Sequence, residues 1–481
     1  MKDSMSNVAY DLLDRYRIGD LSRRDLMRRM SKLGFGVAAS AFMLNEANTM
    51  ALAETGFDWK KYSGSHVSLL LNKHPYVMAL IANLPNFKKL TGIEVSYELF
   101  PEDTYFDKVN AALDGRGGRY DVFMTGAYQA WGYGSASQIV DLNEYLHDPV
   151  MTAPTYDFQD ILPNLRASVA WSGVNGESLD GPGAKQLALP WGFELNSLSY
   201  NTRLLRQAGM EPPRNLPDLM DKAASISAAG NGIYGVGVRG SRSWATIHAG
   251  YISALTNYGG VDFTITDGKL QAAMNSRAAK DFTRLWVKMI QEGGSPNWRN
   301  ATWYEVGADL GAGTSAMIYD ADNLGFFSNR ETNEAGNIGF YPLVPNPAAV
   351  IATPNIWVWS LAMNNFWKRN PAAWNFMQWA TGTENTTFGA TKADLVNPVR
   401  KSIWNNKEFS AKMDKTDPGY LQQYRKIVDQ ARIYLTPQTQ FLETGTQWAG
   451  SLQKMVAGKI DVAEGLDQLA VTIERKLQDA G

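Results

Sequence analysis

The chain has 481 residues, a formal net charge of −2 and no cysteine. This charge gives no electrostatic reason to bind nucleic acid. The lack of cysteine excludes disulfides, thiolate chemistry, cysteine-based metal sites and a lipoprotein anchor. The composition, 44% hydrophobic and 20% charged residues, predicts a soluble globular protein. The length left after an N-terminal signal, roughly 430 residues, suggests two or three lobes.

The first 53 residues predict an export signal. Paired arginines at Arg23 and Arg24 precede a moderately apolar segment, residues 30–44, and a small-x-small sequence at 51–53. This order is typical of a twin-arginine (Tat) signal, which sends a folded protein out of the cytoplasm. Beyond this signal no apolar run approaches the ~20 residues of a membrane span. We therefore expect a soluble periplasmic protein without a lipid anchor.

The segment after the signal predicts a lobe built on a parallel sheet. Strands are expected at 66–71, 93–99 and 120–124, because these runs are apolar or alternate in polarity. Helices are expected between them, at 76–90 and 104–113. A β-α-β-α-β order favours parallel strands covered by helices.

Strand-like segments recur much later in the chain. They are predicted at 187–200, 315–319 and 356–362, with helical stretches between them, and residues from 371 onward are mostly helical. We therefore expect an α/β protein of two lobes, between which the chain crosses more than once.

Several motifs, in this order and behind a Tat signal, resemble one known family. They are residues 120–123 (YDVF), 189–201 (LPWGFELNSLSYN), 316–320 (AMIYD), 337–340 (NIGF) with Pro342, and 458–466 (GKIDVAEGL). The chain resembles the family-1 extracellular solute-binding proteins of carbohydrate ABC importers, with a layout similar to maltose-binding protein. The resemblance covers nearly all of the chain that follows the signal.

The resemblance implies a two-lobed Venus-flytrap fold with crossing strands, a helical C-terminal part and one ligand in the cleft. Lobe 1 is expected to comprise residues 54–190 with about 341–370. Lobe 2 is expected to comprise 191–340 with about 371–481, including the C-terminal helices. The resemblance also implies an ABC permease as partner.

Three residues gain a role from the resemblance. Glu194 matches a carboxylate that accepts hydrogen bonds from sugar hydroxyls, and Trp191 in the same segment is expected to stack on the ligand. Arg400 lies in a Pro-x-Arg sequence common in relatives and is expected to donate to the ligand. Glu194 also has a structural interpretation, as a salt bridge at the hinge, and Arg400 as a salt-bridged loop residue.

Other ligand-binding residues follow from residue chemistry. Aromatic faces stack on the C–H faces of sugars and polyols, and polar groups beside them recognise hydroxyls. Arg242, Trp244, Asp320 and Trp357 are expected for this reason. His74, Tyr76 and Tyr128 are expected because they occupy the loops in which the resemblance implies ligand-binding residues of the first lobe. Arg242 and Trp244 stand at a Gly-rich strand end before a helix, and Asp320 ends a buried strand. The structural alternatives are an exposed Arg242 beside a core Trp244, and Asp320 as a capping residue with Asp322.

The function predicted is capture of a sugar, polyol or small glycoside by hinge closure of a monomer, and delivery to an ABC importer. The four histidines are scattered without metal-ligand spacing, so no metal or other cofactor is expected and no catalysis. The alternative is a Tat-exported carbohydrate-active enzyme, a glycoside hydrolase or lyase, that uses Glu194 and Asp320.

Overall fold

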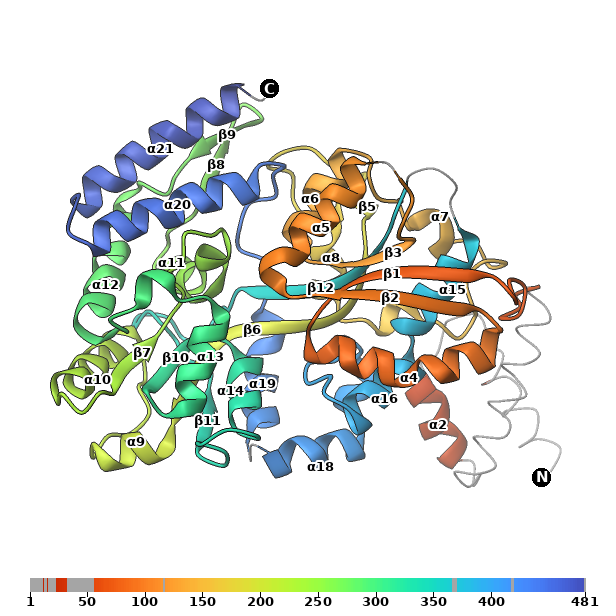
Figure 1. The fold of residues 1–481 in the computed structure, drawn as a ribbon, viewed down its shortest axis with the longest axis horizontal. Coiled ribbons are helices and arrows are strands. Elements are labelled where there is room, and N and C mark those ends of the chain that lie inside the picture. The colour runs from red at the N-terminus through yellow and green to blue at the C-terminus, as the bar shows by residue number, and fades with distance from the viewer. Residues whose placement is uncertain are drawn as a thin grey trace.

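The computed structural model describes residues 12, 15, 23–32, 56–115, 117–365, 370–416 and 419–479 (Figure 1). Helix α2 (Arg23–Lys32) begins at the arginine pair. The predicted cleavage sequence and most of the apolar segment before it lie outside the described residues. None of the helices in the described part of the chain has the length and hydropathy to cross a bilayer.

One lobe of the molecule, here called the first half, contains the predicted parallel sheet; the other lobe is called the second half. Strand β1 (His66–Asn72) pairs in parallel with β2 (Glu94–Phe100) and β3 (Val122–Thr125), and helices α4 (Pro75–Thr91) and α5 (Glu102–Asp114) connect them. The connections after β1 and β2 therefore lie at the same edge of the sheet, where the carboxyl ends of parallel strands meet.

Two strands pass from the first half of the molecule into the second. Strand β6 (Leu189–Asn201) pairs with β12 (Ile356–Met363) over its first part. Over its second part it pairs with β10 (Ser315–Ala321) and β11 (Ile338–Tyr341). The strand order is β2-β1-β3-β12-β6-β10-β7, which makes one continuous ladder across the centre of Figure 1. The predicted crossing strands and the two-lobed α/β fold are confirmed.

Helices cover the sheet of the second half. Strand β7 (Tyr234–Gly237) pairs in parallel with β10, and α13 (Trp303–Ala312) packs against both strands. The other elements that cover this half are α10 (Leu216–Ala228), the π-helix η2 (Ile247–Tyr251), α11 (Ile252–Asn257), α12 (Arg277–Gly293) and α14 (Asp322–Ser328). The C-terminal helices α20 (Phe441–Val456) and α21 (Val462–Asp479) pack against each other and against α12.

Helices α15 (Pro371–Ala380) and α16 (Thr383–Lys392) lie on the first half. They pack against α4, and the Asn83 amide donates to Asn385 Oδ1 at 2.8 Å. The sequence grouped residues from 371 onward with the second lobe. This packing argues for placing 371–392 in the first lobe, and the remaining boundaries stay predictions.

The other elements are short or lie at the periphery. They are α6 (Ala127–Ser135), α7 (Asn143–Leu146), η1 (Phe158–Asp160), α8 (Pro163–Ser168), β4 (Ala170–Trp171), β5 (Lys185–Gln186), α9 (Thr202–Gln207), β8 (Phe263–Thr266), β9 (Lys269–Ala272), η3 (Trp298–Asn300), α17 (Lys401–Trp404), α18 (Lys407–Thr416), α19 (Tyr420–Ile427) and η4 (Val428–Gln430).

Candidate ligand-binding site

A cavity of about 330 Å³ lies between the two halves, beside the crossing strands. The first half contributes the β1–α4 connection and the start of α5. The crossing strands β6 and β12 form its floor, and the second half contributes the β7 end, η2, α13 and α14. Its lining residues are His74, Pro75, Glu102, Glu194, Arg239, Trp244, His248, Trp303, Tyr304, Gly307, Ala308, Ala321, Asn323, Leu324, Phe327, Ser328, Thr332, Trp357 and Trp359.

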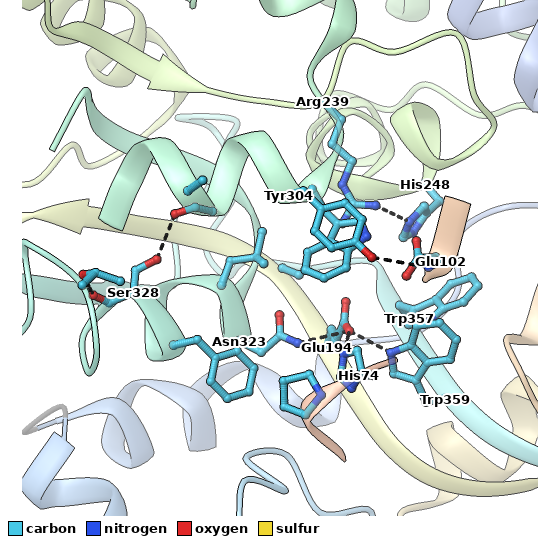
Figure 2. Close-up of a pocket in the computed structure, with 18 of the residues that line it drawn as sticks. His74, Glu102, Glu194, Arg239, His248, Tyr304, Asn323, Ser328, Trp357 and Trp359 are labelled. Atoms are coloured by element: carbon cyan, nitrogen blue, oxygen red, sulfur yellow. Dashed lines mark hydrogen bonds and ion pairs between the residues drawn. The ribbon is translucent and has the colours of Figure 1, made fainter. Parts of the chain in front are cut away.

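Glu194 on β6 is the centre of a hydrogen-bond cluster on the cavity floor (Figure 2). Its Oε1 accepts from the Trp359 indole at 2.9 Å and from the Asn323 amide at 3.1 Å. Burial alone raises the pKa of Glu194, but hydrogen bonds and charge from His74, with Arg239 and Trp359, outweigh burial and hold the pKa below its usual value. Glu194 is therefore an ionised acceptor, and no described residue donates to its Oε2.

His74 is oriented by the start of α4. It caps this helix, and its Nδ1 accepts from the backbone N–H of Tyr76 at 3.2 Å. Because Nδ1 accepts this bond, the ring carries a proton on Nε2, which faces Glu194 Oε1 at 3.5 Å. The helix cap thus aims a donor at the carboxylate.

Arg239, just beyond β7, is held by a buried carboxylate. Its Nε and Nη2 make a bidentate pair with Asp320 at the end of β10, with N–O distances of 2.7 to 3.1 Å. Its Nη1 donates to His248 Nε2 at 3.2 Å. Burial and the Arg239 charge hold the pKa of His248 well below its usual value, so the ring is neutral and carries its proton on Nδ1.

Glu102 at the start of α5 brings a second carboxylate to the cavity. Burial raises its pKa to about 7, against the opposing influence of Arg239. The Asn72 amide donates to its Oε2 at 3.3 Å, and its backbone N–H donates to the Tyr304 hydroxyl of α13 at 3.4 Å. The second of these bonds joins the two halves across the cavity.

Stacked and edge-on rings form the wall opposite α14. Trp244 and Trp357 stack with centroids 5.4 Å apart, and Trp359 meets Trp357 edge-on at 4.9 Å. Trp244 belongs to the second half but contacts Phe106 of α5 and Tyr128 of α6. Rings from both halves therefore meet around the cavity.

Some polar atoms of the lining are buried without a hydrogen-bond partner. They are the donors His248 Nδ1 and Trp357 Nε1 and the acceptor Asn323 Oδ1. Trp303 Nε1 is also without a partner within hydrogen-bond distance, although its indole is close enough to Glu102 to lower the pKa of that carboxyl. Unpaired buried polar atoms are rare in proteins and need an explanation. The residues that carry these atoms all line one cavity.

Comparison with known proteins identifies the family. The model of the family described as bacterial extracellular solute-binding protein matches residues 72–387. An erythritol/L-threitol-binding protein of Mycolicibacterium smegmatis is 36% identical over 468 residues, which are 95% of this chain and 97% of that protein. The chain belongs to the family of bacterial extracellular solute-binding proteins.

Solved structures of ABC transporter solute-binding proteins share the fold. One from Agrobacterium vitis, with bound D-mannitol, aligns with a TM-score of 0.71 at 22% identity over 87% of this chain and 99% of that one. One from Agrobacterium radiobacter, in complex with ribitol, aligns with a TM-score of 0.71 at 20% identity over 85% of this chain and 98% of that one. This solute-binding protein therefore has their two-lobed architecture.

Four of the predicted ligand-binding residues line the cavity: His74, Glu194, Trp244 and Trp357. Tyr128 and Asp320 stand directly behind the lining. The Tyr128 hydroxyl accepts from the Asn355 amide at 3.1 Å, and its ring packs against Trp244 and Trp357. Asp320 is fully buried beneath Arg239.

The other predicted residues lie away from the cavity. The Tyr76 hydroxyl donates to the backbone oxygen of Phe193, and Trp191 is buried in the core. Arg400 is fully buried and donates to three backbone oxygens, which is a structural role. Arg242 is exposed and lines a different groove, because its side chain runs across Gly450 of α20.

Several lining residues escaped the sequence analysis, above all Glu102, Arg239 and Trp359. Glu102 follows β2 as His74 follows β1, and both strands were predicted as parallel neighbours. That signal could have found Glu102. Trp359 is two residues from Trp357 on a strand, and residues two apart share a face. Among the described residues, no group of three or more His, Asp or Glu side chains could hold a metal ion.

Proposed function

We propose that this solute-binding protein captures a small, neutral polyol or sugar in the cavity and delivers it to an ABC importer. The observation that carries this proposal is the set of unpaired atoms of both kinds, His248 Nδ1, Trp357 Nε1 and Asn323 Oδ1, beside the aromatic wall. Each hydroxyl of a polyol both donates and accepts, so one polyol can pair with all of them. The carbon chain would then lie against the indole faces.

The size of the cavity supports a small ligand. Small-molecule sites usually measure roughly 300–1,000 Å³, and this one is near the lower limit at about 330 Å³. A monosaccharide or an acyclic polyol fits this volume better than a long oligosaccharide. The relative named for erythritol and L-threitol supports the same class of ligand.

The charge of the cavity supports a neutral ligand. Arg239 is the only guanidinium or ammonium group among the described lining residues, and Asp320 already pairs with it. Glu194 adds an ionised carboxylate without a further cation. A sugar acid or a phosphorylated sugar would therefore meet repulsion, which costs binding free energy.

A ligand screen tests the proposed function. Thermal shift and calorimetry would compare erythritol, L-threitol, ribitol, D-mannitol, maltose and gluconate on the mature chain. Binding to the folded state stabilises it by RT ln(1 + [L]/Kd), about 4 kcal/mol at a thousandfold excess over Kd. We expect one or more of the neutral four- to six-carbon ligands to bind with 1:1 stoichiometry and gluconate not to bind. Binding of gluconate alone would contradict the proposal.

Glu194→Gln identifies the site. Hydrogen bonds to a charged group contribute about 1.5–3 kcal/mol, so this substitution should raise Kd for the polyol roughly ten- to a hundredfold. Glu211→Gln, on the exposed surface, is the matched control and should leave Kd unchanged. Equal affinities in both variants would place the ligand elsewhere.

We also propose export by the Tat route and a periplasmic location, which rest on the arginine pair at the start of α2, and we propose in addition that the protein is a monomer. Arg23→Lys with Arg24→Lys should leave the precursor in the cytoplasm, detected by fractionation and immunoblotting. Normal export of this variant would argue for another route.

A second candidate function, hydrolysis of a small glycoside, has one observation in its favour. Glu102 and Glu194 share the cavity and their pKa values are displaced in opposite directions, as in a general acid and its partner carboxylate. The pair first considered, Glu194 with Asp320, does not serve, because Asp320 is locked to Arg239. Hydrolysis would be supported if the protein turned over chromogenic glycosides and Glu102→Gln abolished this turnover. Membership of the solute-binding family favours binding instead.

A further inference from the structure

A second hollow, of about 510 Å³, opens on the outside of the second half, between the loop at 240–244, η3 and the C-terminal helices. We call it the outer groove. Four basic side chains line it: Arg242, Arg299, Lys454 and Lys459. The rest of its lining is mainly amide, hydroxyl and small residues, and none of the described residues that line it is acidic.

The basic side chains of the outer groove are unpaired. All four are exposed, and none makes an ion pair or a side-chain hydrogen bond with a described residue. Neighbouring lysines on the same helical layer behave differently, since Lys280 pairs with Asp467 at 2.7 Å and Lys476 pairs with Glu443. In a chain of net charge −2, four unpaired cations around one hollow form a local positive field.

Specific contacts hold the elements around the outer groove in place. The Gln453 amide donates to the backbone oxygens of Gly240 and Arg299, at 2.7 and 2.9 Å, and so fastens the loop and η3 to α20. Gly450 leaves room for the Arg242 side chain, because a Cβ there would stand 3.2 Å from Arg242 Nε. Three elements that are distant in sequence therefore hold their cations around one space.

We propose that the outer groove binds a small polyanion with phosphate-type oxygens. Guanidinium groups present planar donor pairs that match such oxygens, and ammonium groups add point charges. The site is separate from the cavity proposed for the polyol, although one loop borders both, with Arg242 in the groove and Trp244 in the cavity. A neutral polyol therefore binds on one side of this loop and an anion on the other.

Pyrophosphate is the probe that tests the proposal. Calorimetry and thermal shift at low ionic strength should show 1:1 binding that weakens as NaCl is raised, because the cations are exposed. Arg299→Gln with Lys454→Gln should raise the Kd for pyrophosphate about three- to tenfold. The matched control, Lys185→Gln with Lys407→Gln, removes the same charge from exposed sites elsewhere and should not change Kd.

Other outcomes would overturn the proposal. Equal binding by the wild type and both double variants would show a general counter-ion effect. Sedimentation with phosphatidylglycerol vesicles, without binding of free pyrophosphate, would show attraction to an anionic surface instead of a site. The polyol Kd of the Arg299/Lys454 variant is measured in parallel and should equal that of the wild type, so failure at the groove is distinguishable from failure of the proposed function.

Discussion

At the scale of single residues, the cavity keeps two carboxyl groups in different states. Glu194 accepts from Trp359, Asn323 and His74, which together favour its ionised form. Glu102 is half-buried and has fewer donors, so desolvation and the nearby ionised Glu194 raise its pKa to about 7. The difference follows from the number of donors that reach each carboxyl group.

The raised pKa of Glu102 predicts how stability depends on pH. Between about 4.5 and 7 the unfolded chain releases this proton while the folded chain keeps it, so the contribution of Glu102 to stability falls as pH rises and stays lost above 7. Glu102→Gln removes this dependence. We expect similar urea midpoints for variant and wild type at pH 4.5 and a higher midpoint for the variant at pH 8, with Glu211→Gln as control. A constant difference at all pH values would show that Glu102 titrates normally.

Site residues that lie in a recognisable short motif could be predicted from the sequence. Glu194 lies in a family motif and His74 precedes Pro75 at a helix start, so both were expected and both line the cavity. Glu102 and Arg239 have no motif of their own, since an acidic residue at a helix start and an arginine after a strand are common, and only the predicted strand order could have indicated Glu102. Their role depends on which strand ends the sheet brings together, and on Asp320 fixing the direction of Arg239.

At the scale of elements, the turn between β3 and α6 decides where Trp357 can lie. Gly126 starts α6, and a Cβ at this position would stand 2.0 Å from the Trp357 ring. The absence of a side chain lets β12 place this indole directly against the helix start. The position of the Trp357 indole in the cavity wall therefore depends on the lack of a side chain at Gly126, in the connection between β3 and α6.

Gly126→Ala should disturb both stability and binding. Overpacking a filled site costs about 1–3 kcal/mol, so we expect a lower Tm and a weaker affinity for the polyol as Trp357 is displaced. Gly132→Ala on the same helix is the control. Its nearest neighbour is a backbone oxygen at 3.8 Å, so its Tm should be equal or slightly higher, because alanine favours helix. Equal behaviour of the two variants would contradict the proposed constraint.

Sequence patterns predicted the elements better than their interruptions. The apolar run at 187–200 predicted β6, because long apolar segments are typical of buried strands. The helix expected just after Arg242 and Trp244 contains the π-helix η2, where Ala249 has a ψ of −137°. This irregularity brings His248 to the cavity. Residues 371–392 read as helices, but only tertiary packing decides on which lobe they lie.

At the scale of the whole molecule, side chains of the two halves touch directly around the cavity. The Glu102–Tyr304 hydrogen bond and the ring contacts of Trp244 with Phe106 and Tyr128 are among these contacts. Elsewhere the crossing strands join the halves continuously. A ligand that contacts both walls would add to these contacts and favour the closed arrangement.

Small-angle scattering should therefore show compaction on ligand binding. We expect the radius of gyration to fall when the saturating polyol is added, because closure brings α5 and α13 together. Glu194→Gln at the same polyol concentration should keep the larger radius, provided that its unliganded curve matches the wild type. An unchanged radius at saturation, with binding proved by calorimetry, would contradict hinge closure.

The shared ladder of β6 and β12 has a consequence for denaturation. If the first half melted alone, β6 would lose β12 as its neighbour while still paired with β10, and a long apolar strand would be left half uncovered. The hydrogen-bonded strand order runs without a break from the first half into the second, so unfolding of one half has no boundary at which it could stop. Heat should accordingly melt the molecule as one cooperative unit, with a single calorimetric peak whose van't Hoff and measured enthalpies agree.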